Sequence, residues 1–555
     1  MKNNYSILSL GLLSIPFFIL FISSILFIFG FSLNPYISPV SIILSSLFVF
    51  FGIKIKKNNF IVTLKMVIVL LLIVFVSLLL SFFSWDYSYD GQSYHQAIIL
   101  VLKEGWNPVY QHHSGFQNND LSLWIDHYAK GIEIIAAAIY STSGYIECGK
   151  AVNFIIIIAS FFFAFNLLEE YFSFFKFRKK VIIAFLLAAS PVVVNQFVTY
   201  YIDWSLYSLL VILICAILLK SRDYIKYVSI VMVVFLATVI KFNILFFIGF
   251  SIFIYLFYLF VLKEYLEAKR IFLISVLSLI AAIFTSGINP YITNTINHHN
   301  PVYPLLGSDS VDILTYQTPT NMRYKSRLEA VLISLFSETN AQKTEAKVVF
   351  PLYLSSSGIK NAGQPDIRVG GFGVFFSGIL ILSLILYLFS KVKERSKKMN
   401  INLILFFLFF SIFILPAGWW ARYVPFFYAI PIVILLYSEI SEQQGKGFRY
   451  LRNVIYFLLL LNIGISFLSV FAMSIVTKAK TEYCINLVKA SSPVDVNFDN
   501  NIAFKVKLDD DGIIYNEVKK EDLNFETLGP VIYLNRDQLN YTKVEKNWLL
   551  KILKK

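Results

Sequence analysis

The chain has 555 residues, of which 57% are hydrophobic and only 15% charged, and its mean hydropathy is +0.69. A soluble protein would carry roughly 25% charged residues, so the composition excludes an ordinary soluble protein and predicts an all-α polytopic membrane protein. The formal net charge is +14. The basic residues stand in short hinges between apolar runs, a pattern that orients a membrane protein and gives no reason to expect nucleic acid as a partner.

Apolar runs of about 20 residues, each long enough to cross roughly 30 Å of hydrocarbon, recur along the chain. This length criterion predicts about 13 transmembrane helices. We expect them near residues 6–30, 37–53, 60–83, 151–172, 181–199, 204–220, 225–240, 244–262, 271–288, 371–390, 400–416, 422–437 and 452–475.

Six basic hinges set the expected orientation: 54–57, 176–180, 220–226, 263–270, 391–398 and 446–452. Placing them all in the cytoplasm puts the N-terminus there too, and leaves four connections outside. These are 84–150, 200–203, 289–370 and 417–421. All six histidines and six of the seven tryptophans fall in or beside these connections. We therefore expect a multi-pass protein of the cell membrane whose active site lies on the extracytoplasmic face.

The first outer loop opens with Asp86 and Asp90 directly after the apolar run 60–83. Carboxylates at the exit of a membrane helix are costly to hold and are therefore functional by default. The stretch Gln92–Glu104 predicts a helix lying at the membrane interface. Asp90 stands near its start, where the helix dipole favours the ionised form, and such a carboxylate can serve as a general base toward a hydroxyl. The alternative is that Asp90 only caps the helix.

Three further charged residues stand at predicted outer ends of spans. Lys241 and Arg422 lie where a lipid phosphate would sit, although either side chain could instead reach the headgroups without a partner. Asp203 is a candidate second acid that orients an acceptor or binds a metal, or else the N-cap of the next span. The apolar stretch Ile132–Tyr140 is too short to span, so we expect it to be interfacial or re-entrant.

Two other groups of polar residues carry weaker predictions. The basic run Arg323, Lys325 and Arg327 is expected to be a solvated face. The pairs His112-His113 and His298-His299 suggest a metal, with Asp86 or Asp203 as a further ligand. Adjacent histidines point apart on regular structure, however, and no HExxH spacing is present. We predict no metal site, and a divalent cation stays open as a cofactor.

The composition changes after residue 475, so we divide the chain into a transmembrane domain, 1–475, and a small C-terminal α/β domain, 476–555. Parity of the spans puts this second domain outside. Within it, Ile502–Leu508 and Pro530–Leu534 are strand-like, and Lys543–Lys554 is expected to form a helix.

The arrangement Asp90-Gly91-x-x-Tyr94, followed by Gly105-Trp106 and Pro108, resembles the first outer loop of GT-C membrane glycosyltransferases. The branch with the protein O-mannosyltransferases and the lipid A aminoarabinose transferase carries Asp-Glu-x-x-Tyr in this loop. The family's catalytic acid therefore maps onto Asp90. Gly91 stands where that branch often has Glu, so the role of a second acid is open, and Asp86 is an alternative source of a carboxylate from the other side.

Five other segments resemble bacterial GT-C-like proteins of surface-polysaccharide synthesis: His127–Gly131, Glu147–Asn153, Thr199–Asp203, Asn289–Pro304 and Ala421–Tyr423. The resemblance covers roughly residues 60–440 and leaves two N-terminal spans and the tail unaccounted for. It implies a GT-C-like fold and transfer of a sugar from a polyprenyl-phosphate donor, on the outer face, to a cell-envelope glycan, teichoic acid or glycolipid.

The resemblance also suggests roles for individual residues. Asp90 is the expected base, with Asp86 in reserve. Lys241 and Arg422 are expected to bind the donor phosphate, on which charge grows as the sugar departs. The expected supporting residues are Tyr94, His95, Lys130 and Asp203.

Three alternatives remain at this point, and one of them is a non-catalytic relative that kept the architecture. A polysaccharide polymerase or ligase would depend on arginines in a large outer loop near the middle or end of the chain. A flippase or transporter of lipid-linked glycans would show inverted repeats and charges at mid-membrane, whereas the predicted span interiors here are nearly free of charge.

Overall fold

The structure is a computed structural model of the whole chain, and it describes residues 4–55, 60–112, 119–219, 224–307, 309–442, 445–499, 501–519, 525–528 and 532–541. Parts of the predicted hinges 54–57 and 220–226, the residue His113, and the predicted helix Lys543–Lys554 lie outside the described residues.

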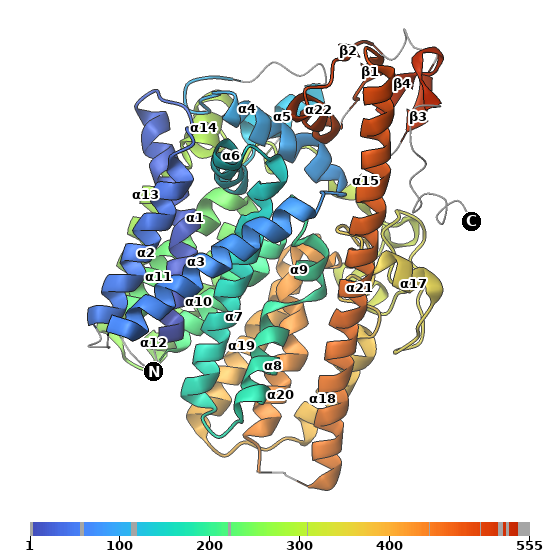
Figure 1. Cartoon of the computed structure of the whole chain (residues 1–555). Helices are drawn as coiled ribbons and strands as arrows, with labels where there is room; N and C mark the ends of the chain where they lie inside the picture. Colours follow the sequence, from blue (N-terminus) through green and yellow to red (C-terminus); the bar gives the residue numbers. More distant parts are fainter. Residues whose placement is uncertain are drawn as a thin grey trace.

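The described chain is mostly helical, and its long helices run side by side in one bundle (Figure 1). Five of them are long and apolar enough to cross a membrane, judged by length and composition. They are α1 (Asn4–Ile28), α3 (Phe60–Phe83), α7 (Ala151–Tyr171) with the turn η2 (Ile146–Lys150) before it, α12 (Phe242–Val261) and α21 (Lys446–Ser491). A sixth span is present if α13 (Tyr265–Ile283) and the segment Ile288–His298, bent by 82° at their break, count as one.

Shorter helices fill the rest of the bundle and its loops. They are α2 (Ile37–Ile55), α4 (Gln96–Lys103), α5 (Asn119–His127), α6 (Gly131–Ser143), α8 (Phe177–Ala188), α9 (Pro191–Gln196), α10 (Trp204–Leu218), α11 (Tyr224–Ile240), α14 (Thr293–His298), α15 (Leu314–Gln317), α16 (Arg327–Leu335), α17 (Ser356–Asn361), α18 (Phe376–Phe389), α19 (Arg395–Ile414), α20 (Ala429–Glu439) and α22 (Ile502–Asp510). Each predicted span contains a helix, but the number of 13 spans is not confirmed, because several of these helices have apolar stretches of only 10–17 residues.

Single helical turns add to this set. They are η1 (Gly91–His95), η3 (Ile288–Ile292), η4 (Thr320–Met322), η5 (Ala421–Tyr423), η6 (Pro425–Tyr428) and η8 (Arg536–Gln538).

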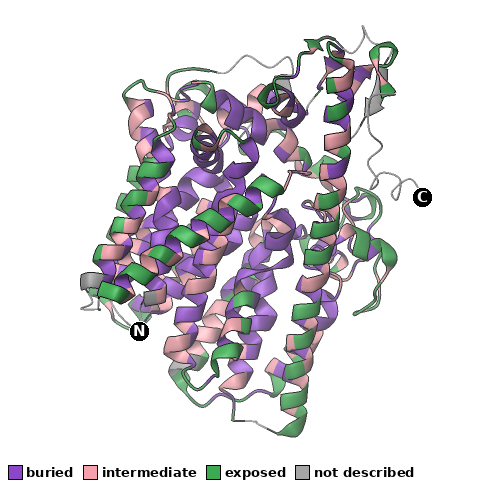
Figure 2. Ribbon diagram, viewed as in Figure 1, coloured by how far each residue is buried: buried purple, intermediate pink, exposed green. Residues whose placement is uncertain are grey.

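The helix α3 lies along the outside of the bundle with large apolar side chains exposed, among them Leu72, Phe75 and Phe83 (Figure 2). Large exposed apolar surfaces on a protein mark contact with another apolar medium or partner. A long helix that is apolar on its outward face is typical of a helix in contact with lipid. Several long apolar helices of this kind make a membrane-embedded protein plausible.

The predicted span over 181–199 is not one continuous helix, because the helix is broken there. α8 ends at Ala188 and α9 begins at Pro191, whose fixed φ suits the first helical position. The Ser190 hydroxyl accepts a hydrogen bond from the Val193 amide at 3.3 Å and so caps α9. Gln196, at the end of α9, donates a hydrogen bond from Nε2 to Asp203 Oδ2 at 3.4 Å.

Two helices expected from the sequence, Gln92–Glu104 and Ile132–Tyr140, are present and are buried in the protein. The stretch Gln92–Glu104 forms the π-helical turn η1 followed by α4, and every residue from Gln96 to Leu102 is buried. The expected Ile132–Tyr140 segment is α6, which is buried from Gly131 to Tyr140. Gly131 allows this packing, because a Cβ there would lie 2.8 Å from the Val239 carbonyl oxygen.

The C-terminal unit has a four-stranded sheet in the order β2-β1-β4-β3, built from β1 (Asp495–Asn497), β2 (Asn516–Glu517), β3 (Phe525–Leu528) and β4 (Ile532–Asn535). Only β1 and β2 pair in parallel. The last turns of α21 belong to the core of this unit, which includes Cys484, Val488, Val496, Phe504 and Leu534.

The prediction of a strand at Ile502–Leu508 is wrong, because this segment is the helix α22. The Asn501 side chain caps it by accepting a hydrogen bond from the Phe504 amide at 3.2 Å. Gly512, with φ of +64°, follows its end. These two end signals outweigh the alternation of apolar residues in between.

Candidate functional site

A cavity of about 560 Å³ lies where several connecting segments meet. It is lined by the turn before α4, by α5 and the residue after it, by the connections before α10 and before α12, by the segment between α14 and α18, and by η5 with its neighbours. Six of the eight predicted site residues line it: Asp90, Tyr94, His95, Asp203, Lys241 and Arg422. The other two, Asp86 and Lys130, do not.

The carboxylate of Asp90 faces this cavity and not the helix that follows it. Asp90 occupies the N-cap position of η1, but its side chain accepts no capping hydrogen bond. One oxygen lies 3.6 Å from Nη1 of Arg422, and 24% of the side chain is exposed, against 1% for Asp203. The alternative in which Asp90 only caps the helix is therefore wrong.

Asp203 and Lys241 form a buried ion pair at the base of the cavity, with 2.5 Å between Oδ1 and Nζ. The alternative roles are wrong for both residues, because Asp203 does not cap α10 and the Lys241 side chain is only 8% exposed. Burial opposes ionisation of both groups. Their mutual attraction outweighs it, so the pKa of Asp203 is lowered and the pKa of Lys241 is raised. Both groups are charged at neutral pH.

Arg422 lies at the centre of the charged groups. Its guanidinium is 3.6 Å from Asp90, 3.7 Å from Asp203 and 3.5 Å from Asp366. The same group stacks on the rings of Tyr201, Trp420 and Tyr423. Its side chain is only 11% exposed, so it does not reach out to headgroups without a partner as the alternative supposed.

Two charged residues of the site, Asp366 and Arg368, were not singled out from the sequence. Arg368 Nη2 lies 3.0 Å from Asp366 Oδ2, the oxygen that also faces Arg422. The indole of Trp420 donates to the other oxygen at 3.1 Å, and burial raises the pKa of Asp366. A signal was present, because this charged pair directly precedes Gly370 and the predicted start of a span, much as Lys241 and Arg422 stand at span ends.

Tyr94 and His95 follow Asp90 on η1 and line the same wall. Their rings lie 4.1 Å apart, and His95 Nδ1 is 2.5 Å from Oε1 of the buried Glu133 on α6. Burial raises the pKa of the Tyr94 hydroxyl, which therefore stays protonated and can donate a hydrogen bond. The contact between His95 and Glu133 therefore joins this wall of the cavity to the core helix α6.

Lys130 does not line the cavity, but its hydrogen bonds hold a residue that does. Its ammonium donates to the carbonyls of Asp126 and Tyr128, at 3.3 and 2.7 Å, and to the side chain of Asn289. Burial lowers its pKa to about 7. These bonds join the end of α5 to η3, and they hold the segment of Tyr128, whose ring lines the cavity.

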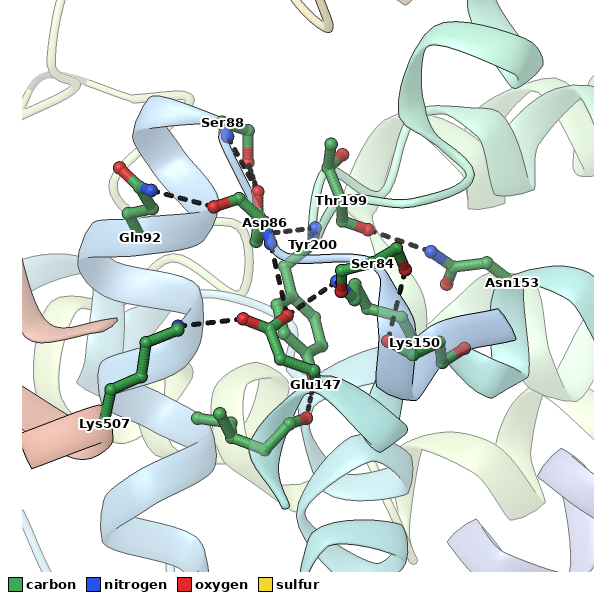
Figure 3. Close-up of polar contacts among 12 residues, drawn as sticks. Ser84, Asp86, Ser88, Gln92, Glu147, Lys150, Asn153, Thr199, Tyr200 and Lys507 are labelled. Carbon is green, nitrogen blue, oxygen red and sulfur yellow. Dashed lines mark hydrogen bonds and ion pairs between the residues drawn. The ribbon is translucent and has the colours of Figure 1, made fainter. Parts of the chain in front are cut away.

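Asp86 is buried outside the cavity, between Ser88 and Tyr200 (Figure 3). Its Oδ2 would lie 2.1 Å from a Cβ on Gly91. The carboxylate of Asp86 thus fills the space that any side chain at position 91 would need. This accounts physically for glycine at the position where the resembling branch often has Glu.

The cations that neutralise the cavity's carboxylates are Lys241, Arg368 and Arg422. No group of three or more His, Cys, Asp or Glu side chains that could hold a metal ion occurs within the described part of the chain. His298 instead stacks on Tyr303 at 3.8 Å.

The predicted basic run in the second connection is solvated, since Arg323, Lys325 and Arg327 are all exposed. Trp106 lies away from the cavity, where its indole donates to the Gln111 carbonyl at 2.9 Å.

Compared with family models, with curated proteins and with solved structures, the chain has no match.

Proposed function

We propose that the protein is an integral membrane glycosyltransferase that moves a sugar from a polyprenyl-phosphate donor to a hydroxyl of a cell-envelope glycan, teichoic acid or glycolipid. The observation that carries the proposal is the accessible carboxylate of Asp90 beside the guanidinium of Arg422 in one cavity. The resemblance of the Asp90 loop to that of GT-C enzymes supplies the reaction class.

Asp90 is the general base in this proposal. It removes the proton from the acceptor hydroxyl while that oxygen attacks the anomeric carbon, and the bond from that carbon to the phosphate oxygen breaks. Its carboxylate is the most exposed of the three acids near Arg422, with Asp366 at 17% and Asp203 at 1%. A base must reach the proton it accepts, and exposure to the cavity meets that condition.

Arg422 is the principal group for the donor phosphate, with Arg368 and Lys241 beside it. As the sugar departs, negative charge grows on the phosphate, and fixed cations in a partly dry site stabilise that charge. Nε and Nη1 of Arg422 are buried, and no acceptor among the described residues meets them with hydrogen-bond geometry. Lys241 is paired with Asp203, so we expect it to contribute less than Arg422 to stabilising the charge on the phosphate.

A second, apolar cavity lies among the helices of the bundle. It has a volume of about 130 Å³ and lies among α7, α10, α19 and α20. Tyr207, one helical turn after Asp203, and Phe426, four residues after Arg422, both line it.

The finer points of topology belong to the same proposal. We infer about 13 spans, a GT-C-like arrangement of them, a cytoplasmic N-terminus, and a cavity that opens on the extracytoplasmic face. The charge bias of the hinges supports this orientation. Polyprenyl phosphate sugars, glycan acceptors and membrane lipids are the expected partners.

The test is the composition of envelope glycans, measured by mass spectrometry, in cells that lack the protein. They are complemented with wild type, Asp90→Asn or Glu345→Gln at matched membrane abundance. Glu345 is an exposed carboxylate of the second large connection. We expect one sugar to disappear without the protein and to return with wild type and Glu345→Gln. Asp90→Asn should lose activity by about 100-fold or more. Full restoration by Asp90→Asn would contradict the proposal.

One observation favours a second candidate, a polysaccharide polymerase or ligase. Arg368 brings a guanidinium from the second large connection into the cavity, which is the kind of residue such enzymes depend on. The same glycan analysis separates the two candidates. Loss of a single sugar substituent supports the transferase, whereas glycan chains shortened to one repeat, or left on their lipid, support the polymerase or ligase.

A further inference from the structure

Asp86 joins two loops that are far apart in sequence. Its Oδ1 accepts hydrogen bonds from the amide and the hydroxyl of Ser88, both at 2.7 Å. Its Oδ2 accepts one from the amide of Tyr200 at 2.8 Å. Figure 3 shows the carboxylate between the two segments. Ser88 lies two residues before Asp90, and Tyr200 lies three residues before Asp203.

The two loops joined in this way carry the acids that face Arg422. Asp90 approaches Arg422 Nη1 from one loop and Asp203 approaches Nε from the other, at 3.6 and 3.7 Å. The Asp86 side chain itself is 1% exposed and does not line the cavity. It therefore acts through the backbone of both loops and has no contact with substrate.

The position of the Asp86 carboxylate requires glycine at position 91. A Cβ on Gly91 would lie 2.1 Å from Asp86 Oδ2 and 2.2 Å from the Ser88 hydroxyl. Contacts that short do not occur between real atoms, so any other residue at position 91 would displace the carboxylate. The turn from Asp86 to Gly91 is thus built around the Asp86 side chain.

A cluster of three charged side chains, Glu147, Lys150 and Lys507, contacts the turn that carries Asp86. Glu147 accepts a hydrogen bond from the Asp86 amide at 3.2 Å, and pairs with Lys150 at 2.6 Å and Lys507 at 2.8 Å. Lys150 also donates to the Ser84 carbonyl at 2.5 Å (Figure 3). Lys507 comes from α22, so the C-terminal unit takes part in fixing this turn.

We propose that Asp86 is a positioning residue for the transfer reaction, which sets the separation of Asp90 and Asp203 about Arg422 by binding the two loops that carry them. The inference rests on the function proposed above. It is a role distinct from that of a reserve base, because the carboxylate's hydrogen bonds are all made to the protein's own backbone and to Ser88.

The first test is structural and needs no substrate. Hydrogen–deuterium exchange of the purified full chain is followed in peptides that cover 84–91 and 197–203. Asp86→Ala should speed exchange of the Ser88 and Tyr200 amides together, by at least about 10-fold, because both lose a charged acceptor. The matched control Ser88→Ala keeps the bond to Tyr200 and should leave the 197–203 peptide unchanged. Unchanged exchange in the 197–203 peptide of Asp86→Ala would overturn the proposal.

Two milder variants keep the test decisive if Asp86→Ala does not accumulate. Asp86→Asn has the same shape but can satisfy only one of the two amides with its single carbonyl oxygen, so one loop should loosen and the other stay protected. Gly91→Ala leaves every charge in place but pushes the carboxylate, so both loops should loosen. Wild-type exchange in both variants would overturn the proposal.

The second test separates positioning from a merely structural effect. In the glycan assay, at matched membrane abundance, Asp86→Ala should lower activity about 10-fold or more in the wild-type background. In the Asp90→Asn background it should cause little further loss, since residues that act through one another are not additive. An equal loss in both backgrounds, or full activity of Asp86→Ala where Asp90→Asn is inactive, would overturn the inference.

These outcomes also separate this inference from the proposed function. If Asp90→Asn is fully active, the proposed transferase fails. The exchange data then decide alone whether Asp86 binds the two loops.

Discussion

Arg422 compensates three carboxylates at once, and Asp90 has its closest cation there. We predict that Arg422→Gln removes product formation and lowers the free energy of unfolding by about 3 kcal/mol, because it leaves buried acids uncompensated. Arg422→Lys keeps the charge but not the planar group that stacks on Trp420, so it should retain stability better than activity. Thermal unfolding in detergent and the glycan assay measure the two effects.

The control for this prediction is Lys325→Gln, which removes an exposed cation from the second large connection. It should leave stability within about 0.5 kcal/mol of wild type. An Arg422→Gln protein that is as stable as this control would contradict the charge balance described for the cavity.

Glu147 makes the stability of the protein depend on pH in the acid range. Burial opposes its ionisation, but Lys150 and Lys507 outweigh burial and lower its pKa to about 2. A carboxyl with a depressed pKa contributes stability above its unfolded pKa of about 4.5 and loses it as the pH falls toward 2. The stability difference between wild type and Glu147→Gln should therefore be largest above about pH 5, and shrink by about 2 kcal/mol by about pH 3. Unfolding curves across this range test it, and a difference that is constant with pH would contradict it.

Single residues were predicted from the sequence where their position along the chain carried the signal. Lys241 and Arg422 are cations on the side of the spans that is otherwise poor in them, and Asp203 is an acid beside a span. The pairing of Asp203 with Lys241 could not be predicted, because it depends on how α10 and α12 pack. Asp366 and Arg368 were missed since they come from a long connection whose path has no periodicity to follow.

At the scale of whole elements, two errors come from helix-end signals that the sequence carries: Ser190 and Pro191 interrupt the helix over 181–199, and Asn501 and Gly512 bound a helix where a strand was predicted. The predicted helix Gln92–Glu104 is present as η1 and α4, and α6 and α22 pack against it. α6 itself was correctly judged too short to span, yet it is a core helix. The break at Ser190 and Pro191 could have been predicted from the sequence, because proline favours the first turn of a helix and disfavours its interior.

Packing of the second large connection against α21 depends on Gly363. A Cβ there would lie 2.6 Å from backbone atoms of Ser469 and Val470. We predict that Gly363→Ala displaces this turn and with it Asp366, three residues later. The change should destabilise the protein by about 1–3 kcal/mol and lower activity in the glycan assay.

The matched control is Gly464→Ala on α21, where an added Cβ meets open space. Alanine should be neutral or stabilising there by up to about 1 kcal/mol, since it favours the helix. Equal stability of the two variants would show that the contact between the connection and α21 is looser than the structure has it.

For the molecule as a whole, α21 is the element that links the two units. It begins at the end of the bundle opposite the sheet and runs up to it (Figure 1). Its last turns join the C-terminal core, while α22 packs against η1 and α4 and pairs Asp510 with Tyr140 at 2.8 Å. The C-terminal unit therefore lies at the same end of the molecule as the turn that carries Asp90.

This arrangement makes the orientation in the membrane testable with three single cysteines. The chain's own cysteines, Cys148, Cys215 and Cys484, are buried, so background labelling should be low. The exposed positions are Glu345, two residues after the cavity-lining Lys343, Asp511 after α22, and Arg395 at the start of α19. The Lys391 amide donates a hydrogen bond to the Ser441 hydroxyl at 2.9 Å, which places the segment before α19 close to the end of α20 and the connection that leads into α21.

We predict that a membrane-impermeant maleimide labels Glu345→Cys and Asp511→Cys in intact cells, and labels Arg395→Cys only after permeabilisation. The basic hinges favour this orientation because positive residues stay in the cytoplasm. The reverse pattern would put the cavity on the cytoplasmic side and exclude transfer on the outer face. Labelling of Glu345→Cys and Asp511→Cys from opposite sides would instead contradict the packing of α22 against η1, and with it the link from Lys507 to the Asp86 turn.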